Sequence, residues 1–145
     1  MGRILAIDYG TKRTGIAVTE ETQSFAFGLT TVATHELGSF LKKYLSENQV
    51  DGFVVGEPKT MSNEPTHSTV HVEGFIKQIS KLFPDVPIHR MDERFTSKMA
   101  SQAILDSGVN KKGRADKSLV DMVSATIILQ SWIEIQSLKK NNEIK

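Results

Sequence analysis

The sequence predicts an α/β fold in which a mixed five-stranded sheet carries helices on both of its faces. Up to about residue 31 the apolar residues form short runs or alternate with smaller ones, which is typical of consecutive strands. Beyond residue 36 the apolar spacing changes to the period of a helix, and two short apolar runs interrupt it. Three consecutive strands followed by β-α units indicate an antiparallel meander extended by parallel strands.

Length and composition favour one soluble domain. The chain has 145 residues, and 39% of them are hydrophobic, which is enough for a core at this length. Cysteine is absent, so disulfides, thiolate metal sites and cysteine nucleophiles are excluded. The start of the chain does not resemble a signal peptide, and no apolar stretch approaches the roughly 20 residues that span a membrane. We expect a cytoplasmic protein with a single domain over residues 1–138 and a polar tail over 139–145.

The first three strands are predicted by apolar runs and by glycines. Residues 3–8 and 14–19 predict a hairpin, because their apolar runs flank a turn bracketed by Gly10 and Gly15. In residues 24–31 large apolar side chains alternate with smaller ones, which predicts the third strand. These three strands would form the antiparallel part of the sheet.

The rest of the chain predicts helices that alternate with two buried strands. Helical spacing of the apolar residues predicts the first two helices, and the final helix is apolar on most sides and is therefore expected to be largely buried. Loops are predicted where glycine, proline, asparagine and charged residues gather. The predicted elements are a helix over 36–47, a strand over 50–56, a helix that ends before Pro84, a strand over 86–91, helices over 97–107 and 117–137, and loops over 57–65 and 110–116.

Acidic residues stand where the predicted strands end. Asp8 ends the first strand, Glu57 follows the fourth, Asp92 and Glu93 follow the fifth, and Asp121 lies near the start of the final helix. The carboxyl ends of parallel strands share one edge of a sheet, which is where such sheets place their sites. Gathered carboxylates repel one another unless a cation holds them, and oxygen ligands favour Mg²⁺ or Mn²⁺. The sequence therefore predicts a metal site at this edge.

Taken singly, each acidic residue also has an ordinary structural explanation. Asp8 and Asp92 would serve as turn residues, and Asp121 would interact favourably with the helix dipole. Glu57 would simply be exposed, and Glu93 would pair with a neighbouring arginine in a surface network. The metal hypothesis depends on the convergence of these residues from distant positions in the chain.

Basic residues accompany the acidic ones. A rim of cations around a metal centre would hold a phosphate backbone without reading its sequence. The alternative is a solvated, flexible basic loop ahead of the final helix. The candidate nucleic-acid-binding residues are Lys12 and Arg13 in the hairpin turn, Arg94 and Lys98 beside the acidic cluster, and Lys111, Lys112, Arg114 and Lys117 before the final helix.

Four blocks of the sequence, in order, resemble those of a known family. They are Ile7–Val18, which contains Asp8-Tyr9-Gly10-Thr11, then Val54–Pro58, Asp92–Ser97 and Lys117–Gln130. Together they resemble the YqgF/RuvX family of RNase H-like proteins, Holliday junction resolvases also described as pre-16S rRNA nucleases. The resemblance covers nearly the whole chain. It implies an RNase H-like fold and a metal-dependent hydrolase of phosphodiester bonds, which acts in 5′-end processing of pre-16S rRNA or in junction resolution.

The resemblance also implies roles for single residues. By position, Asp8, Glu93 and Asp121 match the family's acidic triad, which would hold Mg²⁺ or Mn²⁺. Glu57 stands where many members have leucine, whereas related junction resolvases take a catalytic glutamate from the end of this strand. Glu57 therefore stays open as an additional ligand. The implied partners are structured RNA or branched DNA and pre-ribosomal particles, with no membrane, and the protein would be a monomer or a homodimer.

Other classes of function remain open on the sequence. The hairpin after Asp8 also resembles the phosphate-binding opening of actin and sugar kinases, but those proteins need two such domains, for which 145 residues are too few. A non-catalytic nucleic-acid-binding or ribosome-assembly module would keep the fold without turnover. The choice between RNA and DNA is also open, because phosphate contacts carry no sequence information.

Overall fold

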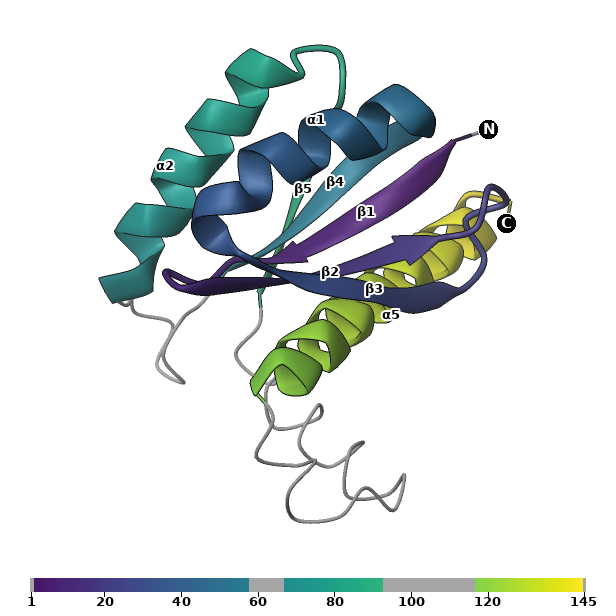
Figure 1. The fold of residues 1–145 in the computed structure, drawn as a ribbon. Coiled ribbons are helices and arrows are strands. Elements are labelled where there is room, and N and C mark those ends of the chain that lie inside the picture. The colour runs from purple at the N-terminus through teal and green to yellow at the C-terminus, as the bar shows by residue number, and fades with distance from the viewer. Residues whose placement is uncertain (1, 58–66, 93–116, 145) are drawn as a thin grey trace.

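A computed structural model of the chain describes residues 2–57, 67–92 and 117–144. Three strands come first, and helices then alternate with the two remaining strands, as predicted (Figure 1). They are β1 (Arg3–Asp8), β2 (Arg13–Thr19), β3 (Ala26–Ala33), the 3-10 turn η1 (Thr34–Glu36), α1 (Leu37–Glu47), β4 (Val50–Glu57), α2 (His67–Leu82), β5 (Ile88–Asp92) and α5 (Lys117–Ile144).

The five strands form one mixed sheet in the order β3-β2-β1-β4-β5. β1 and β3 each pair with β2 in antiparallel fashion, whereas β4 runs parallel to both β1 and β5. Helices α1 and α2 lie over one face of this sheet, and α5 crosses the opposite face (Figure 1). The predicted α/β fold is therefore confirmed, with the meander at one side of the sheet and the parallel strands at the other.

Two strands begin later than the sequence predicts. β3 starts at Ala26, because Glu20 accepts hydrogen bonds from the backbone N–H groups of Ser24 and Phe25 and holds both residues in the preceding turn. Gln23 in this turn has a φ of 59°. β5 starts at Ile88, after a proline that lacks a backbone donor. The predicted helix over 97–107 and most of the two predicted loops lie outside the described residues.

α5 is longer and less buried than the sequence predicts. It continues to Ile144, through the segment expected to be a polar tail, and residues 117–144 contain no glycine or proline to end it. One sheet face can cover only one side of a helix, so most of its other apolar residues are half-buried. The buried residues are Ser124, Ala125, Ile128, Leu129 and Ile133. Among the described helices, none is both long enough and apolar enough to cross a membrane.

Two hydrophobic cores lie on the two faces of the sheet. Leu5 and Ile7 of β1 belong to the core under α1 and α2, whereas Ile4 and Ala6 belong to the core under α5. Successive side chains of a strand point to opposite faces, and burying one aliphatic side chain stabilises the fold by about 2 kcal/mol. The same alternation directs Asp8, at the end of β1, toward the face that α5 covers.

Candidate active site

Three acidic residues end neighbouring parallel strands at one edge of the sheet. Asp8 is the last residue of β1, Glu57 of β4 and Asp92 of β5. In the register of the sheet Ile7 lies opposite Val55, and Glu57 lies opposite Asp92. Glu57 and Asp92 thus belong to their strands, where the sequence predicts that they follow them. The backbone positions of the three residues meet at the predicted edge.

Asp121 lies near this edge because a glycine in β2 lets α5 pack closely against the strand. Gly15 pairs with Asp8 across the β1–β2 ladder. A β-carbon at position 15 would overlap the carbonyl oxygen of Asp121, so the backbone of α5 lies directly against this strand. Opposite residues of an antiparallel pair direct their side chains to the same face. Asp8 and Asp121 therefore lie on the same side of the sheet, and both are neighbours of Gly15.

A second glycine brings the same part of α5 against β3. A β-carbon on Gly28 would lie 2.8 Å from the Cγ atom of Met122 and 3.2 Å from the Oγ1 atom of Thr126. The start of α5 thus packs closely against two neighbouring strands, β2 and β3. This packing fixes the position of Asp121 along the sheet. The sequence pattern predicts Gly15 as a turn glycine and indicates no role for Gly28.

Arg13 forms an ion pair with Asp121. Its Nε atom lies 3.0 Å from the Oδ2 atom of Asp121, across 108 positions of sequence. The side chains are 38% and 25% exposed, so water screens the pair partly. The sequence predicts Arg13 as a phosphate-binding residue, but in this structure its guanidinium is bound to a candidate metal ligand. Lys12, its neighbour in the turn, is exposed.

The turn that joins Asp8 to Arg13 is held by Thr34 from the far side of the meander. The Thr34 hydroxyl donates to the carbonyl of Gly10 at 2.6 Å, and the Thr34 N–H donates to the carbonyl of Lys12 at 3.0 Å. A β-carbon on Gly10 would overlap the carbonyl oxygen of Arg13. This bracing fixes the spacing between the aspartate and the arginine. No local sequence signal predicts it, since Thr34 lies beyond β3.

The remaining predicted site residues are described in part or not at all. For Glu57 and Lys117 the structure describes the backbone alone. Within the described part of the chain, no three acidic, histidine or cysteine side chains lie close enough together to hold a metal ion. The residues outside the described ranges are Glu93, Arg94, Lys98, Lys111, Lys112 and Arg114.

Asp8 and Asp121 nevertheless fit one half of a site for Mg²⁺ or Mn²⁺. Both are carboxylates, the hard oxygen donors that these ions prefer. Both lie on the α5 side of the sheet, next to Gly15, and both are half-buried, so they are reachable from solvent. Asp121 already binds a cationic group, the guanidinium of Arg13. A further acidic side chain would have to complete such a site.

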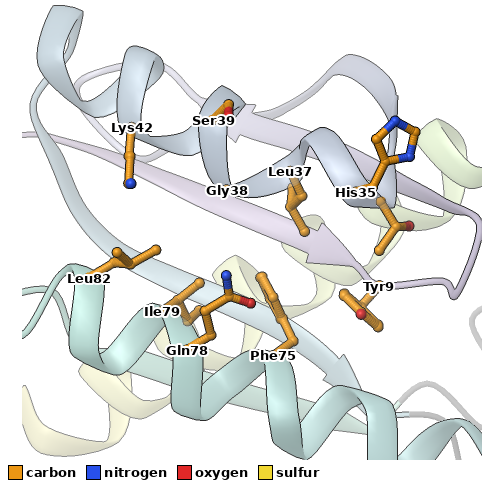
Figure 2. A pocket seen from close by; sticks show the side chains of 11 residues that line it. Tyr9, His35, Leu37, Gly38, Ser39, Lys42, Phe75, Gln78, Ile79 and Leu82 are labelled. Carbon is orange, nitrogen blue, oxygen red and sulfur yellow. The ribbon is translucent and has the colours of Figure 1, made fainter.

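A hollow beside the end of β1 lies on the other face of the sheet. It is a cavity of about 360 Å³ between α1 and α2, and Figure 2 shows Tyr9 and Phe75 side by side at one end and Lys42 at the other. The rings of Tyr9 and Phe75 stack with centroids 4.8 Å apart. The cavity therefore begins one residue after Asp8 but opens away from the acidic edge. The other lining residues are Thr34, His35, Leu37, Gly38, Ser39, Gln78, Ile79 and Leu82.

The sheet order, the helices on both faces and the acidic edge define an RNase H-like α/β protein. A solved structure with this fold is that of T. thermophilus RuvC in complex with Holliday junction substrate. It superposes with a TM-score of 0.59 over 94% of this chain and 96% of that chain, at 14% sequence identity. More specifically, the chain belongs to the RuvX family, described as Holliday junction resolvase, whose model matches residues 2–135. The family predicted from the four sequence blocks is thus confirmed.

Curated relatives match almost the full length of the chain. A protein of Christiangramia forsetii is 56% identical over 133 residues, which are 92% of this chain and 98% of the relative. A protein of Flavobacterium johnsoniae is 53% identical, with 92% and 96% of the two chains covered. A third, from Phocaeicola vulgatus, is 52% identical over 134 residues. All three carry the name "Putative pre-16S rRNA nuclease".

Proposed function

We propose that this protein is a metal-dependent nuclease that hydrolyses phosphodiester bonds in structured nucleic acid, with precursor 16S rRNA as the favoured substrate. The observation that carries the proposal is the placement of Asp8 and Asp121 next to Gly15 on one face of the sheet. Membership in the RuvX family supports hydrolysis of nucleic acid. The names of relatives that are about half identical to this chain favour the RNA precursor over a four-way DNA junction.

The proposed site uses carboxylates to hold the metal and cations to hold the substrate. Asp8, Glu93 and Asp121 would bind Mg²⁺ or Mn²⁺, with Glu57 as a candidate additional ligand. When bound, two such ions supply activation of the attacking water and stabilisation of the leaving oxygen. The rigid end of β1 and the packed start of α5 keep Asp8 and Asp121 in fixed relative positions, which lowers the cost of assembling the site.

The basic residues would position the phosphate backbone. Lys12 lies exposed in the turn beside Asp8, and Arg13 begins β2 next to it. Arginine and lysine bind phosphate through charge-assisted hydrogen bonds, which orient the chain without reading bases. The other members of the proposed rim are Arg94, Lys98, Lys111, Lys112, Arg114 and Lys117.

The test is cleavage of a precursor 16S rRNA fragment and of a matched four-way DNA junction by wild type and by Asp8→Asn. Wild type is expected to cleave the RNA when Mg²⁺ or Mn²⁺ is present and to stop in EDTA. Asp8→Asn should lower the rate at least about 100-fold while circular dichroism shows an intact fold. Glu47→Gln, which removes an exposed carboxylate at the end of α1, is the matched control and should cleave normally.

The same assay separates the competing functions. A non-catalytic module would bind the RNA without metal-dependent cleavage, and undiminished cleavage by Asp8→Asn would refute the assignment of that residue. Cleavage of the junction in preference to the RNA would change the substrate. It would also require a homodimer, because the two strands of a junction are cut symmetrically. A monomer or homodimer that acts on pre-ribosomal particles in the cytoplasm stays our prediction.

A further inference from the structure

The ion pair between Arg13 and Asp121 places a fixed positive charge on a candidate metal ligand. Arg13 is the first residue of β2, and Asp121 lies in the second turn of α5. Their contact joins Nε of the guanidinium to Oδ2 of the carboxylate at 3.0 Å. The guanidinium therefore brings a positive charge to within hydrogen-bond distance of this carboxylate.

A divalent cation and this guanidinium would compete for the same carboxylate. A guanidinium is charged at every accessible pH. A metal ion bound to Asp121 would lie within a few ångströms of it, where like charges repel strongly unless water separates them. The Arg13 side chain is 38% exposed, so it can leave Asp121 without opening the core. Occupation of the carboxylate by metal therefore favours departure of the arginine.

The departing guanidinium has a natural acceptor in the substrate. The planar fork of arginine matches the oxygens of a phosphate group, and a phosphodiester held beside the metal would lie near the edge that Arg13 already occupies. The exposed Lys12 lies beside it in the braced turn. One side chain can thus neutralise the site before the metal arrives and then contact the phosphate.

We propose that Arg13 is a built-in counter-ion that occupies Asp121 in the metal-free protein and moves to the substrate phosphate when metal binds. The inference rests on the proposed function, because it takes Asp121 as a metal ligand. If Arg13 is a counter-ion, its removal should change metal affinity in the opposite direction from removal of a residue that only orients Asp121. Removal of a competitor tightens metal binding, whereas removal of an orienting residue weakens it.

The first experiment measures Mn²⁺ binding by calorimetry in the absence of nucleic acid. Arg13→Gln is expected to bind Mn²⁺ about fivefold more tightly than wild type, because one repelling charge is gone. The same variant should bind an RNA fragment more weakly. Lys42→Gln removes the same charge from α1 on the opposite face and should stay within about twofold of wild type. Equal or weaker Mn²⁺ binding by Arg13→Gln overturns the proposal.

A second measurement uses the wild-type protein and does not depend on how a variant folds. The Nε–H resonance of Arg13 in NMR spectra should report the hydrogen bond to Asp121 in the metal-free state. Titration with diamagnetic Mg²⁺ is expected to shift this resonance to its position in Asp121→Ala, where the acceptor is lost. A resonance that keeps its metal-free position at saturating Mg²⁺ refutes the exchange.

The two proposals fail in different ways. If wild type binds no Mn²⁺, the proposed metal site is wrong, and the counter-ion role falls with it. If wild type binds Mn²⁺, Asp121→Asn abolishes binding and Arg13→Gln does not tighten it, then the nuclease proposal stands and the counter-ion role alone is refuted.

Discussion

The two faces of the sheet are built from side chains of different size. Toward α1 and α2 the central strands present large residues such as Leu5, Ile16 and Phe53, and two helices cover them. Toward α5 they present Ala6, Ala17 and Gly15 beside Ile4 and Val54, and one helix lies against them and against Gly28 of the edge strand β3. Large interlocking side chains stabilise a fold, whereas small ones let a helix backbone approach a strand. The face with the small residues is the one that carries Asp8 and Asp121.

This difference separates stability from the placement of functional groups. The α1–α2 face supplies most of the large buried side chains. The α5 face fixes where the helix lies along β2, and with it the position of Asp121. Substitutions on the two faces should therefore have different consequences, and three experiments test this difference.

The largest effect is expected from Gly15→Ala. The added methyl group would overlap the backbone of Asp121, so the start of α5 must move. We expect a loss of about 3 kcal/mol in the free energy of unfolding and at least tenfold weaker Mn²⁺ binding by the folded protein. Urea denaturation and calorimetry measure the two quantities.

Gly74→Ala is the matched control for this substitution. Gly74 lies in α2, and a β-carbon there would meet no atom within 4 Å. Alanine favours a helix over glycine, so this variant should gain up to about 1 kcal/mol and bind Mn²⁺ normally. If Gly15→Ala binds Mn²⁺ as well as Gly74→Ala does, close packing at Gly15 does not place Asp121.

A truncation on the other face should reduce stability alone. Leu41 of α1 is fully buried in the core under α1 and α2, so Leu41→Ala is expected to cost about 3 kcal/mol. The molecules that remain folded should bind Mn²⁺ within about twofold of wild type. A marked loss of affinity in folded Leu41→Ala would show that the two faces are coupled through the sheet.

The smallest effect concerns pH and returns to the α5 face. Burial lowers the pKa of His89 below its ordinary value of 6.5, and the charge of Lys139 lowers it further. The centroid of the His89 ring lies 5.0 Å from the centroid of the Trp132 ring. Because the folded state holds this proton less tightly than the unfolded state, stability is complete above about pH 6.5 and declines as the pH falls through the folded pKa.

His89→Phe should remove this decline, since phenylalanine can pack against Trp132 without titrating. Urea denaturation of wild type and variant between about pH 8 and pH 5 measures the slope. An unchanged slope in His89→Phe would mean that another group causes the decline.

The sequence predicted the sheet and its acidic edge because both follow from local patterns. Apolar periodicity identified every strand, and Asp8, Glu57 and Asp92 end parallel strands, so their common edge followed from topology alone. The misplaced start of β3 came from Glu20, whose side chain extends the turn through contacts that periodicity does not encode. The late end of α5 came from a segment that contains no glycine or proline to end the helix.

The contacts that organise the site could not be read from the sequence. Gly15 resembles a turn glycine, yet its missing side chain makes room for a helix that begins about 100 residues later. Arg13 was predicted to contact phosphate, and nothing local to it indicates a partner at Asp121. Such contacts depend on how distant elements pack, so only the three-dimensional structure reveals them. The predicted ligand Glu93 stays a prediction.

The separation of Arg13 and Asp121 by 108 residues also sets the order in which the site can form. The β1–β2 hairpin is local and can close quickly, whereas docking of α5 must overcome the entropy of a long loop. A chain that has folded its meander but not docked its last helix presents Asp8 without Asp121. Under the proposed function, such incompletely folded molecules would lack part of the metal site and would not cleave RNA.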